Sequence, residues 1–61
     1  MRNYRLYLLD AGARIIRFEA VTAETDAEAA IEAERLAYSN AIEIWEGARK
    51  VALIPPPQVG E

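Results

Sequence analysis

The sequence predicts an α+β domain with the element order ββαββ, in which one helix packs on one face of a four-stranded, mostly antiparallel sheet. Three observations support this fold. Apolar and polar residues alternate in four short segments, as they do in strands that bury one face. Between the second and third segments, the apolar spacing changes to that of a helix. The chain has 61 residues, which allows one domain, predicted at 1–54 and followed by an extended, proline-rich tail at 55–61.

The first two strands are predicted at 4–9 and 14–21, with a turn at 10–13 between them. Asp10 can accept hydrogen bonds from the backbone that follows it, and Gly12 can adopt a positive φ. A short turn of this kind between two alternating segments is typical of a β-hairpin.

The segment 25–40 has the apolar spacing of a helix. Thr25 and Glu28 are three residues apart, as in a capping box, which predicts the start of the helix. Asn40 is the expected left-handed residue at its end. The stripe that should face the sheet is mostly alanine, which lets a helix lie close to strands: Ala29, Ala30, Ala33, Leu36 and Ala37.

The last two strands are predicted at 41–46 and 49–54, with a hairpin turn centred on Gly47 and Ala48. The three prolines at 55–57 cannot donate to a strand ladder, so the fourth strand should end before them. The first strand is the most apolar and is therefore expected in the interior of the sheet, in the order 2-1-3-4.

One helix can cover only one face of a four-stranded sheet. Strand alternation predicts that the covered face contains Leu6, Leu8, Ile16, Phe18, Ile42, Ile44, Val51 and Leu53. The uncovered face is predicted to contain Arg5, Tyr7, Ile15, Arg17, Glu19, Glu43, Trp45, Lys50, Ala52 and Ile54. It would thus mix aromatic and aliphatic side chains with charges of both signs.

The composition argues against an enzyme. The sequence has no cysteine and no histidine, so a thiolate metal site and the commonest general base are both excluded. Glu19 and Glu43 should share a face, but an open sheet face offers them no cleft in which to act as a catalytic pair. The acidic residues at 24–28 are explained by helix capping. We therefore expect no catalytic residues, no metal and no cofactor.

The charge balance is acidic, with seven basic and ten acidic residues and a net charge of −3. A general nucleic-acid binder usually has a basic excess, because phosphate contacts supply much of its affinity. No apolar segment approaches the roughly 18 residues needed to span a membrane. The segment 1–15 alternates like a strand rather than resembling a signal peptide, and a cytoplasmic location is expected.

The size of the chain favours self-association. In a domain of this length, hydrophobic burial and the entropic cost of ordering nearly cancel. Without disulfides, additional burial has to come from a second surface. Trp, Tyr and Arg are enriched at such surfaces. The candidate interface residues are Trp45, Tyr7, Arg5, Arg17, Ile15, Lys50 and Ile54.

These observations favour a small, non-enzymatic protein-interaction module that forms a homodimer, or docks a protein partner, through its open sheet face or an edge strand. The alternative is a weak single-stranded nucleic-acid binder, in which Trp45 and Tyr7 would stack on bases. Two further possibilities are a solvated face held by cross-strand ion pairs and a subunit that completes an enzyme site with a partner. The three prolines are better explained as a strand terminator than as a ligand for an aromatic groove.

Three segments together resemble a family of small uncharacterised proteins of alphaproteobacteria: YRLYLLDAGARIIRFE, TDAEAAIEAERLA and AIEIWEGARKVALI. The resemblance covers residues 3–54, and the last hairpin is its most specific part. It implies the same order of strands and helix, but no activity and no catalytic residues. Asn40 departs from the pattern, since such proteins often have Gly or Asp nearby, and this difference affects only the end of the helix.

Overall fold

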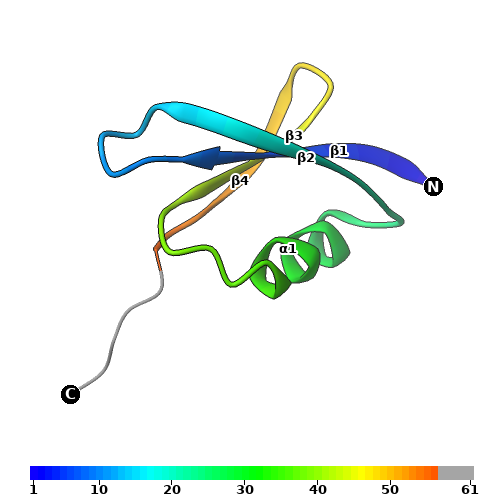
Figure 1. Ribbon diagram of the computed structural model, residues 1–61. Helices are drawn as coiled ribbons and strands as arrows, with labels where there is room; N and C mark the ends of the chain where they lie inside the picture. The colour runs from blue at the N-terminus through cyan, green and yellow to red at the C-terminus, as the bar shows by residue number, and fades with distance from the viewer. Residues whose placement is uncertain (57–61) are drawn as a thin grey trace.

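The computed structural model describes residues 1–56 and contains the predicted elements in the predicted order (Figure 1). They are β1 (Arg2–Leu9), β2 (Ile15–Ala23), α1 (Asp26–Arg35), β3 (Ile42–Glu46) and β4 (Arg49–Ile54). The strands form one sheet in the order β2-β1-β3-β4, and all neighbours are antiparallel. The fold class and the strand order are confirmed. The predicted tail lies outside the described residues from position 57 onward.

The start of α1 follows the capping prediction. The Thr25 hydroxyl accepts a hydrogen bond from the amide nitrogen of Glu28 at 3.1 Å. The Glu28 carboxylate reaches back to the amide nitrogen of Glu24 at 3.2 Å, one residue before the usual capping-box donor. Side chains thus satisfy one amide of the first helical turn and one amide just before the helix.

The helix ends earlier than the sequence predicts. It stops at Arg35 rather than near Asn40, and Ala37 takes the left-handed conformation with φ 51°. The amide nitrogen of Ala37 donates to the carbonyl oxygen of Glu34 at 3.1 Å, which tightens the last turn. Tertiary structure decides this end, because the next segment must cross back to the sheet, where the Tyr38 hydroxyl donates to the carbonyl oxygen of Leu9 at 2.7 Å.

The hydrophobic core lies between α1 and one face of the sheet (Figure 1). Its largest fully buried side chains come from the two central strands, β1 and β3: Tyr4, Leu6, Leu8 and Ile44. The helix contributes Ala29 and Ala33, which are at most 1% exposed. Small residues on this stripe bring the helix close to the strands, as the sequence predicts. Within residues 1–56, no helix is long and apolar enough to cross a membrane.

In β2 the prediction of the two faces was wrong. Phe18 is 50% exposed and lies opposite Tyr7, on the face that the helix leaves open. Arg17 and Glu19 lie on the same side of the sheet as the helix, because β1 presents buried leucines opposite them. Ile16, which was also expected in the core, is 60% exposed.

The geometry of the first hairpin explains this difference. β2 buries only its last part, where Ala23 is 3% exposed and Val21 packs against the core. The turn end of the hairpin extends away from α1, so apolar residues there gain no cover from the helix (Figure 1). A register shift beside Leu8 also leaves Ile16 without a partner in β1.

A bulge likewise reverses the predicted faces of the second half of β4. The register shifts beside Trp45, which leaves Val51 without a partner in β3. Ala52 and Ile54 therefore pack against the core, whereas Leu53 is 51% exposed on the opposite face. Val51 packs against the core, as predicted.

Candidate interaction surface

The open face is the face of the sheet opposite α1, and its side chains form two rows across the four strands. The first row consists of Phe18, Tyr7, Glu43 and Leu53. The second row consists of Ala20, Arg5, Trp45 and Lys50. Each row takes one residue from each strand, so residues far apart in the sequence become neighbours.

Aromatic contacts link the two strands on the β2 side of the open face. The rings of Tyr7 and Phe18 have centroids 6.1 Å apart and are inclined at 54°. The guanidinium carbon of Arg5 lies 5.0 Å from the centroid of the Phe18 ring, in a cation–π arrangement. These contacts hold Phe18 in place but leave half of it exposed.

Glu43 organises the other half of the open face. Its carboxylate accepts a hydrogen bond from Nε1 of Trp45 at 3.0 Å and lies 3.7 Å from Nζ of Lys50. The one polar atom of the Trp45 side chain is therefore satisfied within the chain. The rest of the indole is an apolar surface, partly exposed beside a neutralised ion pair.

The structure places four of the predicted interface residues on the open face: Arg5, Tyr7, Trp45 and Lys50. Ile15 is 56% exposed and pairs with Leu9 beyond the register shift. The other two placements were wrong. Arg17 lies opposite Leu8 on the side of the helix, and Ile54 packs against the core.

Two exposed apolar residues of the open face were missed, Phe18 and Leu53. The segment 14–21 has apolar residues at both odd and even positions, so its pattern does not show which face of the strand is buried. For Leu53, the deciding feature is the bulge at Val51, because the residues after it point to the opposite face from the one that regular alternation predicts. No residue type in β4 signals that bulge.

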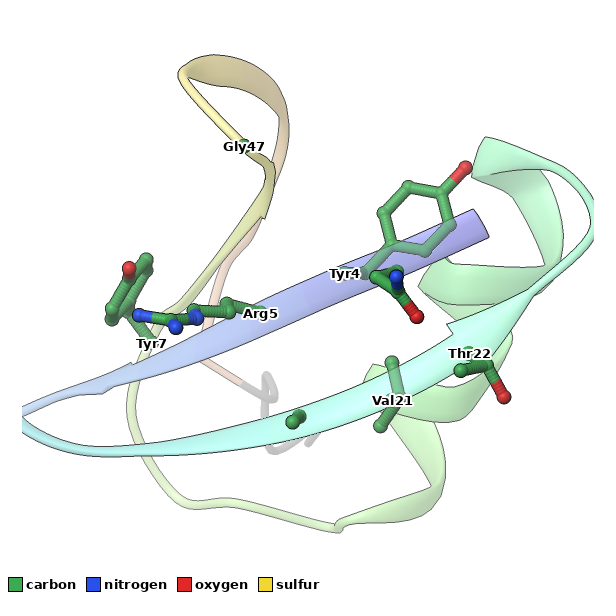
Figure 2. A pocket seen from close by; sticks show the side chains of 8 residues that line it. Tyr4, Arg5, Tyr7, Val21, Thr22 and Gly47 are labelled. Carbon is green, nitrogen blue, oxygen red and sulfur yellow. The ribbon is translucent and has the colours of Figure 1, made fainter. Parts of the chain in front are cut away.

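A shallow groove of about 540 Å³ lies on the open face, between β1, β2 and the β3–β4 turn. Figure 2 shows Arg5 and Tyr7 on β1, Val21 and Thr22 on β2, and Gly47 on the turn. Among residues 1–56, Arg5 is one of two cationic side chains, with Arg14, that have no carboxylate within ion-pair distance. The groove is therefore slightly cationic in a chain that is acidic overall.

A network of charged side chains joins three elements of the fold next to this groove. Arg2 donates two hydrogen bonds to Glu46, both at 2.8 Å, and Arg49 donates two to Asp26, at 3.2 and 3.0 Å. Arg49 also donates to Glu46 at 2.6 Å, and the Tyr4 hydroxyl donates to Asp26 at 2.7 Å. The network joins the start of β1, the start of α1 and the β3–β4 turn.

The pKa shifts in this network follow from its hydrogen bonds. Those from Arg2 and then Arg49 lower the pKa of Glu46 to about 2. Arg49 and then Tyr4 lower the pKa of Asp26, and the same Asp26 contact helps to raise the pKa of Arg49. Burial, followed by the hydrogen bond to Asp26, raises the pKa of Tyr4. Both carboxylates are held in the charged form as ion-pair partners, which is a structural role.

Within residues 1–56, no group of three or more acidic, His or Cys side chains is placed to hold a metal ion. No protein-family model, curated protein or solved structure matches the chain. The family resemblance of the last hairpin therefore stays a prediction. In the structure, Glu46 and Arg49 of that hairpin form hydrogen bonds that join it to β1 and α1.

Proposed function

We propose that this protein is a non-enzymatic interaction module whose open face binds an apolar surface of another protein molecule, either a second copy or a different protein. One observation carries the proposal. Phe18 and Leu53 are 50% and 51% exposed on the face that the helix leaves uncovered, beside the aromatic rings of Tyr7 and Trp45. Completing the burial of such half-exposed side chains stabilises a complex by about 1 kcal/mol each.

The polar groups of the open face support a protein partner. Trp45 and Lys50 already share Glu43 as their partner, so an apolar surface can dock without leaving their polar atoms unpaired. An interface core of this type, with aromatic anchors and few free charges, is typical of protein–protein contacts.

The same groups support the non-enzymatic part of the proposal. Acid–base chemistry needs a pair of titratable groups whose environments separate their pKa values while leaving both accessible to a substrate. Glu43, the carboxylate of the open face, is occupied by Trp45 and Lys50. Glu46 and Asp26 are occupied by arginines.

Single-stranded nucleic acid is the second candidate partner, and Arg5 is the observation that favours it. Arg5 has no carboxylate partner among residues 1–56 and lies against the Phe18 ring, a combination that suits a phosphate beside a stacked base. Glu43 in the middle of the first row opposes a phosphate backbone, and the net charge of −3 does so over longer range. We therefore favour the protein partner.

Trp45 provides the test, because it is the one tryptophan of the chain and lies on the open face. Its emission and the sedimentation coefficient should be followed together from micromolar to millimolar protein. Leu53→Ser should weaken association and reduce the change in emission. Ile31→Ser is the matched control, because Ile31 is 48% exposed on α1 rather than on the sheet.

Three further measurements complete the test. A single-stranded oligonucleotide at low salt should leave the Trp45 emission unchanged, and strong, salt-dependent quenching would favour the nucleic-acid alternative. If the parent stays monomeric, immobilised parent and Leu53→Ser should be compared for the proteins they retain from an extract. A monomeric parent that retains nothing dependent on Leu53 would contradict the proposal.

A further inference from the structure

The two edges of the sheet differ in how they are protected against pairing with another strand. β4 has only six residues, begins with Arg49 and Lys50, and contains the bulge at Val51. Pro55 and Pro56 follow it directly. Charges, bulges, prolines and short length are the means by which natural sheets block an edge. The β4 edge has all four.

The β2 edge is less protected. It has nine residues, without a lysine or a proline. Its one irregularity is the register shift near its start, and Ile15, Ile16 and Phe18 at that end are at least 50% exposed. A long edge without lysine or proline, with exposed apolar residues at one end, is a template for another strand.

The backbone groups of β2 that are free to pair with another strand can be identified from the hydrogen-bonding pattern of β1 with its neighbours. The amide nitrogen of Leu9 donates to the carbonyl oxygen of Ala41 at 3.0 Å, so the peptide groups of Leu9 point toward the β3 side. Alternation along β1 gives Tyr7 the same direction. The peptide groups of Phe18, which pairs with Tyr7, therefore point away from β1 and toward the free edge. The peptide groups of Ala20, two positions further along β2, point the same way.

We propose that two copies of this chain pair antiparallel through β2, with the two-fold axis at Phe18, and form one continuous eight-stranded sheet. In this register Phe18 lies opposite Phe18 of the second copy, and Arg17 lies opposite Glu19 of the second copy. Ile16 lies opposite Ala20 and Ile15 opposite Val21, so apolar residues also face apolar residues.

Charge complementarity selects this register. Arg17 and Glu19 are the only charged residues of β2, and they form an ion pair of 3.8 Å on one side of the strand within a single copy. An axis at Phe18 brings each arginine opposite the glutamate of the other copy. An axis at Ala20 would instead place Glu19 opposite Val21 and leave the charges unmatched. Opposite charges across neighbouring strands stabilise a pair, and like charges destabilise it.

The pairing closes at two copies. Each protomer uses its β2 edge in an isologous contact, and the β4 edges that remain outermost are blocked. The open faces of both copies then form one surface with the two Phe18 rings at its centre. The inference goes beyond the proposed function, because the two copies pair through the β2 edge and leave their open faces available to a further partner.

Charge reversal tests the pairing without touching the core. Arg17→Glu places glutamate opposite glutamate twice in the dimer, and Glu19→Arg places arginine opposite arginine twice. Each variant alone should therefore raise the dimer dissociation constant at least about tenfold. An equimolar mixture of the two variants should recover the affinity of the parent, because both contacts then join opposite charges. Sedimentation velocity measures all three samples, and circular dichroism confirms that each variant is folded.

Arg35→Glu is the matched control, because Arg35 is as exposed as Arg17 and also has a glutamate partner, but lies on α1. It should leave association unchanged. A parent that is monomeric, or a mixture that does not recover affinity, would overturn the β2 pairing. A dimer that is insensitive to these reversals but weakened by Leu53→Ser would overturn the β2 pairing and leave the open-face proposal standing.

Discussion

The two hairpins of the sheet are built from similar segments but are held in different ways. The β3–β4 hairpin is anchored at its turn, where Glu46 and Arg49 bind Arg2 and Asp26 from two other elements. The turn of the β1–β2 hairpin is held locally, by Asp10, whose carboxylate accepts hydrogen bonds from the amide nitrogens of Gly12 and Arg14, both at 2.9 Å. One hairpin is fixed by long-range contacts and the other by its own turn.

This difference leads us to expect separate roles for the two hairpins, one in stability and the other in association. Arginine–carboxylate pairs join the anchored hairpin to β1 and α1, and the adjacent β4 edge is blocked. The other hairpin extends beyond the helix and leaves Ile15, Ile16 and Phe18 exposed. We expect changes in the anchored hairpin to alter the free energy of unfolding, and changes in the extended hairpin to alter association.

The largest expected effect compares Ile44 of the anchored hairpin with Phe18 of the extended one. Ile44 is fully buried, so Ile44→Ala should lower the free energy of unfolding by about 2–5 kcal/mol. Phe18→Ala should lower it by less than about 1 kcal/mol, because half of the ring is already exposed. Urea denaturation followed by circular dichroism, at protein concentrations below those of association, measures both. Equal losses would show that the extended hairpin is as important for folding as the anchored one.

The second prediction concerns acid, which should affect the anchored hairpin. Glu46 has a folded-state pKa of about 2, against an ordinary value of 4.5. A depressed folded pKa contributes stability that is fully present above the unfolded value and is lost as the pH falls through the folded value. The free energy of unfolding should therefore decline between about pH 4.5 and 2, and the lowered pKa of Asp26 should add to the decline.

Glu46→Gln separates this contribution from the other carboxylates. The variant should be less stable than the parent at pH 7, and the difference should shrink as the pH falls toward 2. Thermal unfolding at several pH values gives the comparison. A difference that stays constant with pH would show that Glu46 acts through packing rather than through its charge.

Much of this fold is predictable from the sequence because its signals are local. Alternation in β1 and β3 identifies four buried residues of the central strands: Leu6, Leu8, Ile42 and Ile44. It misses Leu9, which is 3% exposed, and Thr25 identifies the start of the helix. The two edge strands are less predictable. Bulges beside Ile16 and Val51 insert one residue each, and a shift of one residue exchanges the two faces of a strand.

Long-range contacts set the remaining limits. The sequence places Glu46 and Arg49 at the ends of a turn, but their partners Arg2 and Asp26 lie at least 20 positions away in the chain. No local sequence pattern predicts such a network of ion pairs. The open face was half predictable: Tyr7 and Trp45 lie on the regularly alternating central strands, whereas Phe18 and Leu53 lie on edge strands that each contain a register shift.

A smaller effect is expected from the glycines of the two turns. Gly47 has φ +60°, a conformation that residues with a side chain rarely adopt, although a Cβ there would meet nothing within 4 Å. Gly47→Ala should therefore lower the free energy of unfolding by about 1 kcal/mol through backbone strain. Gly12 has no positive φ, and its Cβ would make an ordinary 3.5 Å contact with Asp10, so Gly12→Ala should not destabilise the chain. Destabilisation of equal size in both variants would contradict this assignment.

The smallest effect is a stabilisation of the extended hairpin. Its left-handed residue is Ala13, with φ 65°, and not Gly12 as the sequence suggests. Ala13→Gly removes that strain but increases the entropy of the unfolded chain, which leaves a net gain of about 0.5 kcal/mol, or about 2–4 °C in Tm. Ala48→Gly in the anchored turn is the control. Since Ala48 has no positive φ, this change relieves no strain and should lower Tm. If both substitutions lowered Tm, the backbone at Ala13 would not be strained. Alanine would then suit position 13 of the first turn as well as it suits position 48 of the second.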